Sequence, residues 1–324
     1  KDADATLAAS MALGVADGVS HLEDFGLDAA KFPRDLLMAC NELAAEQLLP
    51  GQNGQIRASY SGPVPLLNDA FKSTETHGSA TVMLALMDNN TKVMGKPCPM
   101  VSIVSVGDCQ LLVLRRGERG QPLEVVSHSG CKRREDKQKN SLHVTRVDTR
   151  IDPMFREAIT VEVIEQGSTV TCIFAKEGDI IIAGTNGVFD NLFVSELVDL
   201  CNTALDGQLL PISDQVLGHL AQCIVMAAHA KTRRSQTGAR SECPIGLGGK
   251  EDDTSVVVAE VVELTEVRVQ AAQAESPTRR VKDEDIFGVA LWKSVIGGLV
   301  PDLNQLKKNT SCCTNHRDND SEIF

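Results

Sequence analysis

The sequence predicts an α+β fold in which layers of sheet and helix pack on one another. Apolar, β-rich runs such as residues 77–88 and 100–106 have the composition of buried strands. Other segments, such as residues 27–49 and 213–231, carry apolar residues at helical intervals. Groups of strands alternate with helices along the chain, and this order favours stacked layers over a helical bundle or an all-β sandwich.

The first half of the chain predicts strands around one long helix. Leu13 and Val15 lead to Asp17-Gly18, so a strand is expected to enter a loop here. Residues 100–118 contain two apolar runs joined at Gly107-Asp108, which predicts a tight hairpin. The long helix is expected within residues 27–49, and its apolar face comprises Leu36, Leu37, Cys40, Leu43 and Ala44.

The second half predicts more strands, followed by paired helices. Residues 131–140 form a run of mixed charge that is expected to be a solvated loop. Apolar and polar residues alternate over residues 158–187, which predicts two or three strands. The later elements are helices at 192–205 and 213–231, with Ser213 as the N-cap of the second, and a strand at 250–264.

The character of the chain changes near residue 269. We therefore predict one domain over residues 1–268, followed by a linker and a partly helical extension over residues 269–324. The apolar stretch at residues 285–300 is expected to be a helix docked on the domain; a segment at a membrane surface is the alternative. Acylation of the adjacent Cys312-Cys313 is a further, weaker alternative.

Composition excludes several classes of protein. The 324 residues suit one large domain with a tail, or two domains. A net charge of -12 argues against a nucleic-acid partner and suits a protein that handles cations. Ten cysteines without the spacing of a zinc site or disulfide scaffold indicate reduced thiols, hence an intracellular location. We expect no signal peptide, no transmembrane segment and a monomer.

Acidic residues recur where apolar β-rich runs begin or end. A single aspartate at a strand end commonly occupies a turn, and that remains the simplest interpretation of each one alone. Together, however, clustered carboxylates repel one another unless a cation neutralises them, and all-oxygen ligands favour Mg²⁺, Mn²⁺ or Ca²⁺. Two such ions can activate a water for in-line attack on phosphorus. The residues concerned are Asp17, Asp108, Asp190, Asp252 and Asp253.

The motifs around these aspartates resemble one family. They are Gly14 to Val19, Gly78 to Thr81, Val106 to Cys109, Gly178 to Ile180, Gly187 to Asn191, and Gly249 to Thr254. In this order, over about residues 2–264, they resemble the metal-dependent serine/threonine protein phosphatases of type 2C, the PPM family. The Asp17-Gly18-Val19 sequence is similar to the branch of that family with D-G-V in place of D-G-H-G-G.

The resemblance implies a fold, a metal site and a reaction. The fold would be an α-β-β-α sandwich of two antiparallel sheets with helices outside. Two Mn²⁺ or Mg²⁺ ions would be bound in a cleft at one sheet edge, with a weaker third. A water bridging the metals would attack phosphoserine or phosphothreonine in protein substrates, without a phosphoenzyme. The branch includes mitochondrial members, so the expected location is the cytoplasm or mitochondria.

The resemblance also implies roles for individual residues. Asp17 would bridge both metals and hold the catalytic water between them, and the Gly18 carbonyl would bind the second metal. Asp252 would bind the first metal, while Asp108 and Asp190 would frame the third site. Asp4, or Asp2, would match an acidic element that holds metal-bound water.

Three positions depart from the family pattern. Asn186 stands where the family has a metal-binding aspartate, and an amide offers one uncharged oxygen, so weaker metal binding is expected. Val19 stands where much of the family has a histidine; nearby His21 is expected to be an ordinary exposed or packing residue. No arginine precedes Asp4 to bind phosphate, although Lys1 or Arg57 could supply positive charge.

These departures leave two further interpretations beside a phosphatase. One is a pseudophosphatase with the same fold, whose weakened metal site makes it a binding or regulatory module. The other is an unrelated calcium-binding domain. The substitution Asn186→Asp separates the phosphatase from the pseudophosphatase, since a latent enzyme would gain metal affinity and rate and a remodelled binding site would gain neither.

Overall fold

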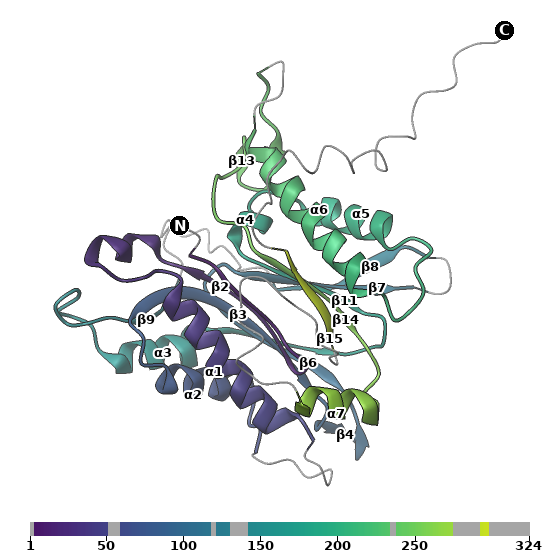
Figure 1. Ribbon diagram of the computed structural model, residues 1–324, viewed down its shortest axis with the longest axis horizontal. Helices are drawn as coiled ribbons and strands as arrows, with labels where there is room; N and C mark the ends of the chain where they lie inside the picture. The colour runs from purple at the N-terminus through teal and green to yellow at the C-terminus, as the bar shows by residue number, and fades with distance from the viewer. Residues whose placement is uncertain are drawn as a thin grey trace.

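Two large antiparallel sheets pack face to face in the computed structural model, and helices cover both outer faces (Figure 1). The structure describes residues 3–50, 59–117, 121–129, 142–233 and 238–274, together with the backbone of residues 292–297. This arrangement confirms the α+β class and the α-β-β-α sandwich.

The first sheet holds the N-terminal strands. Its strand order is β1-β2-β3-β6-β10, and β9 also pairs with β3. Helices α1, α2 and α3 cover its outer face (Figure 1). The bounds are β1 (Ala5–Ala8), β2 (Ala12–Gly18), β3 (Gly78–Asp88), β6 (Met100–Val106), β9 (Val144–Arg146), β10 (Thr169–Phe174), α1 (Lys31–Leu48), α2 (Pro63–Ser73) and α3 (Glu157–Gly167).

The second sheet has the order β15-β14-β11-β7-β8, and α5 and α6 cover it (Figure 1). Its strands and helices are β7 (Gln110–Arg116), β8 (Leu123–Ser129), β11 (Ile180–Gly184), β14 (Val256–Val261), β15 (Trp292–Gly297), α5 (Val194–Ala204) and α6 (Asp214–Thr232). Smaller elements are a 3-10 helix η1 (Ser20–Phe25), α4 (Asn186–Phe189), α7 (Glu266–Ala274), β4 (Lys92–Val93), β5 (Lys96–Pro97), β12 (Glu242–Cys243) and β13 (Gly246–Leu247).

Strand β11 shows why the strands of these sheets have continuous apolar sequences. Ile181 and Ala183 belong to the core between the two sheets, whereas Ile180 and Ile182 belong to the core beneath α5 and α6. Successive side chains of a strand point to opposite faces, so a strand covered on both sides must be apolar at every position. The run of Ile180 to Ala183 follows from this position in the sandwich.

Several elements predicted from the sequence are confirmed. The long helix is α1, the strand that enters a loop at Asp17-Gly18 is β2, and the paired helices are α5 and α6. Ser213 caps α6 as expected, because its side chain accepts a hydrogen bond of 3.4 Å from the Val216 amide.

The predicted tight hairpin at Gly107-Asp108 is wrong. Strand β6 pairs with β3 and β10 in the first sheet, whereas β7 pairs with β8 and β11 in the second. The chain therefore crosses from one sheet to the other at this turn. Gly107 has a φ of 102° and packs so closely on Thr81 that a Cβ would lie 2.5 Å from the Thr81 side chain.

The prediction of two or three strands over residues 158–187 is confirmed for two of them, β10 and β11, and is wrong for the first third of the segment. Residues from Glu157 to Gly167 form α3 rather than a strand. Thr160 and Ile164, one helical turn apart, are its buried residues, and α3 packs on α2 and β9. Packing on neighbouring elements here overrides the β preference of a Thr, Val and Ile-rich segment.

The apolar C-terminal segment also differs from its prediction. Residues Trp292–Gly297 form strand β15, antiparallel to β14, where a docked helix was expected. The segment contains Val295 and Ile296 and ends in glycine, a composition that suits a strand better than a helix. Residues 131–140 and Cys312-Cys313 lie outside the described residues, as do Lys1, Asp2 and Arg57. Among the described residues, no helix is long and apolar enough to cross a membrane.

Candidate functional site

Strand ends from both sheets meet at one end of the sandwich. In the first sheet, Asp17 lies opposite Thr81, and the next β3 residue, Val82, lies opposite Val106. The turn at Asp108 is thereby brought beside the end of β2. In the second sheet, β11 ends where β14 begins, because Gly184 lies opposite Val256. The segments just before β14 and just after β11 therefore share this end.

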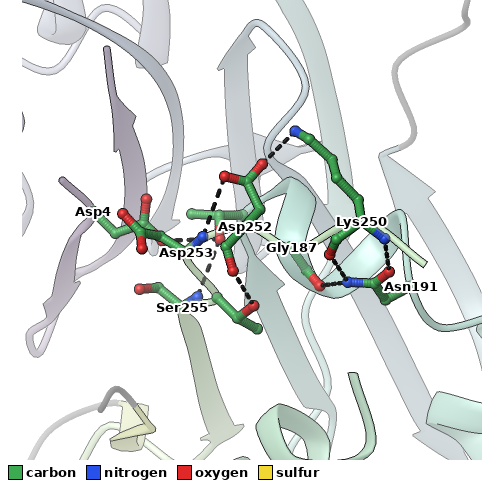
Figure 2. Close-up of polar contacts among 9 residues, drawn as sticks. Asp4, Gly187, Asn191, Lys250, Asp252, Asp253 and Ser255 are labelled. Carbon is green, nitrogen blue, oxygen red and sulfur yellow. Dashed lines mark hydrogen bonds and ion pairs between the residues drawn. The ribbon is translucent and has the colours of Figure 1, made fainter. Parts of the chain in front are cut away.

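The N-terminal segment is joined to the second sheet at this end. The Ala3 amide donates a 3.0 Å hydrogen bond to Asp253 Oδ2. Thr185 Oγ1 donates to Asp4 Oδ2 at 3.1 Å and accepts from the Ser255 amide at 3.1 Å. Asp4, which precedes β1 of the first sheet, is thus bound to the second sheet, and Figure 2 shows it beside Asp253.

Helix α4 and the segment before β14 are held together by Asn191. Its side-chain amide donates to the carbonyls of Gly187 and Lys250, both at 2.9 Å. Its Oδ1 accepts from the Lys250 amide at 2.8 Å, so the main chain of Lys250 is bound on both sides (Figure 2). Asn191 is fully buried, and its polar atoms are all used in these contacts, as burial requires.

Asp17 lies in an environment that disfavours its charged form. Burial, followed by the negative charges of Asp252 and Asp108, raises its pKa to about 7. The positive charge of Lys250 and a hydrogen bond with Asp4 oppose the rise. Asp17 is therefore repelled by the carboxylates around it, and an additional cation would reduce this repulsion.

Lys250 is the basic side chain that faces these carboxylates. Its Nζ forms an ion pair with Asp252 Oδ2, and the two side chains are 43% and 31% exposed. Burial lowers the pKa of Lys250, but the hydrogen bond and charge of Asp252 raise it by more, and its pKa is raised overall. The charges of Asp190 and Asp108 act in the same direction.

Buried oxygens of two residues at this end have no hydrogen-bond partner among the residues that the structure describes. They are Oδ1 of Asp108 and Oδ1 of Asn186. Asn186 is the first residue of α4 and is only 7% exposed. Buried acceptors without a donor cost free energy, so such groups are usually found where a water or an ion completes them.

The donor set fits a hard divalent cation. Its members are carboxylate and amide oxygens, the ligands that Mg²⁺ and Mn²⁺ prefer, and they carry an excess of negative charge. Across the described ranges, however, no three Asp, Glu, His or Cys side chains are grouped closely enough to hold an ion as they stand. Asp252 is paired with Lys250 in this arrangement, so a cation that bound Asp252 would take the place of that ammonium group.

Two glycines allow the close packing at this end. A Cβ on Gly18 would lie 2.5 Å from the carbonyl oxygens of Ala3 and Ala29. A Cβ on Gly187 would lie 2.2 Å from the Asp253 carbonyl oxygen. Both positions therefore require glycine for steric reasons, independently of any ligand.

The structure brings together most of the residues singled out in the sequence. Asp4, Asp108 and Asp252 all act on Asp17, and Asp190 acts on Lys250. His21 is exposed on η1, as expected. Sequence reasoning missed the roles of Lys250, Asn191 and Thr185. A basic residue at the head of the acidic run Glu251 to Asp253 was the available signal for Lys250.

Comparisons with known proteins identify relatives by sequence. No protein-family model matches the chain. Probable protein phosphatase 2C 62 of Arabidopsis thaliana is 26% identical over 250 residues, which cover 76% of this chain and 29% of the plant protein. The protein phosphatase PTC7 homolog of Xenopus laevis is 28% identical over 270 residues, covering 78% of each chain. These names describe phosphatases, and they give no support to a pseudophosphatase.

A solved structure shows the same fold. The X-ray structure of the photosystem II phosphatase PBCP superposes with a TM-score of 0.55 at 22% identity, covering 81% of this chain and 92% of that one. Relative to the plant proteins matched by sequence, the chain is short: it spans less than half the length of each of the first two, 29% and 48%.

Proposed function

Because this chain belongs to the type 2C (PPM) family of protein phosphatases, we propose that it hydrolyses phosphoserine and phosphothreonine in proteins with divalent cations as cofactors. The names of the relatives, which are protein phosphatases, support proteins as the substrates. Mn²⁺ or Mg²⁺ is the proposed cofactor, with two ions per site and a weaker third.

The observation that carries this proposal is the electrostatic state of Asp17. A carboxyl group whose pKa is raised to about 7 by burial and by neighbouring carboxylates marks a site with too much negative charge for its surroundings. The unpartnered buried oxygens of Asp108 and Asn186 support the same interpretation. A set of oxygen donors with this excess of negative charge is typical of a site that binds a divalent cation, rather than of carboxylates that only stabilise turns.

The proposed ligands follow the family resemblance, residue by residue. Bound divalent cations would neutralise the carboxylates and supply an activated water for attack on phosphorus. Asp17 would be a ligand of both ions, the Gly18 carbonyl a ligand of the second and Asp252 a ligand of the first, and the Asn186 oxygen would be a further ligand. The proposed residues of the weaker third position are Asp108 and Asp190, and the proposed acidic residue of the N-terminal strand is Asp4.

The direct test is hydrolysis of a phosphoserine peptide with and without Mn²⁺ or Mg²⁺. Wild type is expected to be active only with the metal. Asp17→Ala is expected to lower the rate more than about 100-fold, since even residues that merely support metal ligands cost 10- to 100-fold. The exposed Asp199 on α5 provides a matched control, and Asp199→Ala is expected to keep the wild-type rate.

Two results would contradict the proposal. One is the absence of turnover by wild type across millimolar concentrations of both metals. The other is a rate for Asp17→Ala that equals the rate for Asp199→Ala. A melting curve for each variant checks that both remain folded, and Asp17→Ala is expected to be at least as stable as wild type without metal because it removes a repelled carboxylate.

A further inference from the structure

Lys250 occupies an unusual position for a basic residue in this protein. It lies at the acidic end of the sandwich, where its Nζ pairs with Asp252 and its charge lowers the pKa of Asp17 (Figure 2). The proposed metal ligands are all acidic or neutral, so Lys250 has no place among them. A lysine that pairs with one of these ligands competes with a metal cation for that carboxylate. A second binding partner for the ammonium group would remove this competition.

The backbone of Lys250 is held rigidly while its side chain stays accessible. Asn191, which is fully buried, binds both the amide and the carbonyl of Lys250. The preceding residue, Gly249, has a φ of 64° and packs on Asn191, because a Cβ there would lie 2.8 Å from Asn191 Oδ1. The side chain itself is 43% exposed. The buried Asn191 side chain thus acts as a clamp that fixes the main chain of Lys250, while the ammonium group of Lys250 remains accessible to solvent.

The ammonium group of Lys250 has unused bonding capacity. It carries three N–H donors, and Asp252 is the acceptor that it contacts within the described part of the chain. An ion pair between partly exposed side chains contributes little free energy, so it exchanges readily for a better partner. A phosphate monoester carries up to two negative charges and several acceptor oxygens, and is such a partner.

We propose that Lys250 binds the phosphate group of the substrate, and that it leaves Asp252 to do so. This inference rests on the proposed function, because it assigns a phosphate ligand to the same site. When a divalent cation neutralises Asp252, the ammonium loses the charge that holds it there. Its position beside Asp252, close enough to act on Asp17, then places a positive charge where a phosphate dianion would bind.

The test measures binding rather than turnover. Titration of the Mn²⁺-loaded protein with inorganic phosphate, followed by calorimetry, compares wild type with Lys250→Met, Lys250→Arg and Lys92→Met. Lys92 is an exposed lysine of β4, at the other end of the sandwich from α4 (Figure 1). Lys250→Met is expected to weaken phosphate binding about 10- to 100-fold, as loss of a hydrogen bond to a charged group does. Lys250→Arg and Lys92→Met are expected to bind nearly as wild type.

A parallel Mn²⁺ titration without phosphate separates the alternatives. We expect Lys250→Met to bind Mn²⁺ at least as tightly as wild type. If phosphate binding is unchanged in that variant while Mn²⁺ binding tightens, Lys250 is only a stand-in cation for Asp252 and the proposal is overturned. Equal losses of Mn²⁺ and phosphate affinity would also overturn it, since the effect would then run through the metal.

A replacement variant and a competition experiment complete the test. Should Lys250→Met fail to fold, Lys250→Gln replaces it, with the same expectation. Competition by a phosphoserine peptide, but not by its unphosphorylated form, distinguishes a bound ester from free phosphate alone. Wild type that binds no phosphate overturns the inference. Wild type that binds phosphate through Lys250 yet hydrolyses no peptide contradicts the proposed function and leaves this inference standing.

Discussion

Asn186 is the residue at which this chain differs most from the acidic pattern around it. Its side-chain oxygen is buried without a hydrogen-bond partner among the described residues. The preceding residue, Thr185, donates a hydrogen bond to Asp4, which in turn is hydrogen-bonded to Asp17, a carboxyl with a raised pKa. A carboxylate at position 186 would add further repulsion in the absence of metal. The amide therefore avoids that repulsion, but it provides a weaker ligand for a cation.

Asn186→Asp is expected to tighten Mn²⁺ binding about 30- to 150-fold, because a charged ligand is worth ~2–3 kcal/mol more than a neutral one. The metal-free variant should melt at a lower temperature than wild type, since it gains a buried negative charge. Calorimetry and thermal melts measure the two effects. The matched control is Asn202→Asp on α5, where Asn202 Oδ1 accepts a hydrogen bond from the Leu123 amide. Equal Mn²⁺ affinity in both variants would refute the assignment of Asn186.

At the scale of elements, the site depends on how closely α4 packs on the segment before β14. The nearest approach is at Gly187, where a Cβ would meet the Asp253 carbonyl oxygen at 2.2 Å and Thr254 Oγ1 at 2.6 Å. Asn191 fastens the same segment from the other end of α4. Residues 250–254 are thus positioned by a short helix that is distant in sequence.

Gly187→Ala is expected to destabilise the protein by about 1–3 kcal/mol through overpacking, although alanine is the better helix former. The displaced segment carries Asp252, so Mn²⁺ binding should weaken as well. Gly167→Ala is a matched control at the end of α3, because its nearest neighbour is a terminal methyl of the exposed Leu142 side chain. Urea denaturation and metal titration test both variants. Identical stability of the two would mean that α4 does not press on residues 253–254.

At the scale of the whole molecule, Arg115 and Asp179 join the two sheets. Asp179 is 1% exposed and accepts hydrogen bonds of 2.7 Å from both Nε and Nη2 of Arg115. Arg115 Nη2 also donates to the carbonyl of Phe174, which belongs to β10 of the first sheet. Asp179 precedes β11, whereas Asn186 follows it, so this pair lies at the opposite end of the strand from the site.

Arg115→Met is expected to lower the free energy of unfolding by about 3 kcal/mol, because it leaves the buried Asp179 carboxylate without its counter-charge. The figure is at the low end for buried pairs, since the Arg115 side chain is 23% exposed. Mn²⁺ affinity should not change. Arg150→Met removes an exposed partner of Asp148 and is expected to leave the urea midpoint where it is. A large loss of Mn²⁺ binding in Arg115→Met would contradict this separation of stability from the site.

Local patterns were sufficient for many elements and insufficient for others. Helices α1, α5 and α6 were predictable from the helical period of their apolar residues, and strands β2, β11 and β14 from their short continuous apolar runs. Helix α3 and strand β15 were not, because their identity depends on the neighbours that they pack or pair with. The turn at Gly107 likewise looks the same in sequence whether it closes a hairpin or changes sheets.

The order of amino acids by itself determined the layered α+β class, the family resemblance and the carboxylates at the strand ends. These properties depend on residue type and short-range spacing, which the sequence displays directly. Only the tertiary structure decided how those carboxylates are surrounded: the burial of Asp17, the pairing of Lys250 with Asp252 and the clamp made by Asn191. The burial of Asp17 and the Asn191 clamp arise between segments far apart in the chain, where distance and burial, rather than spacing in the sequence, set the interaction energy.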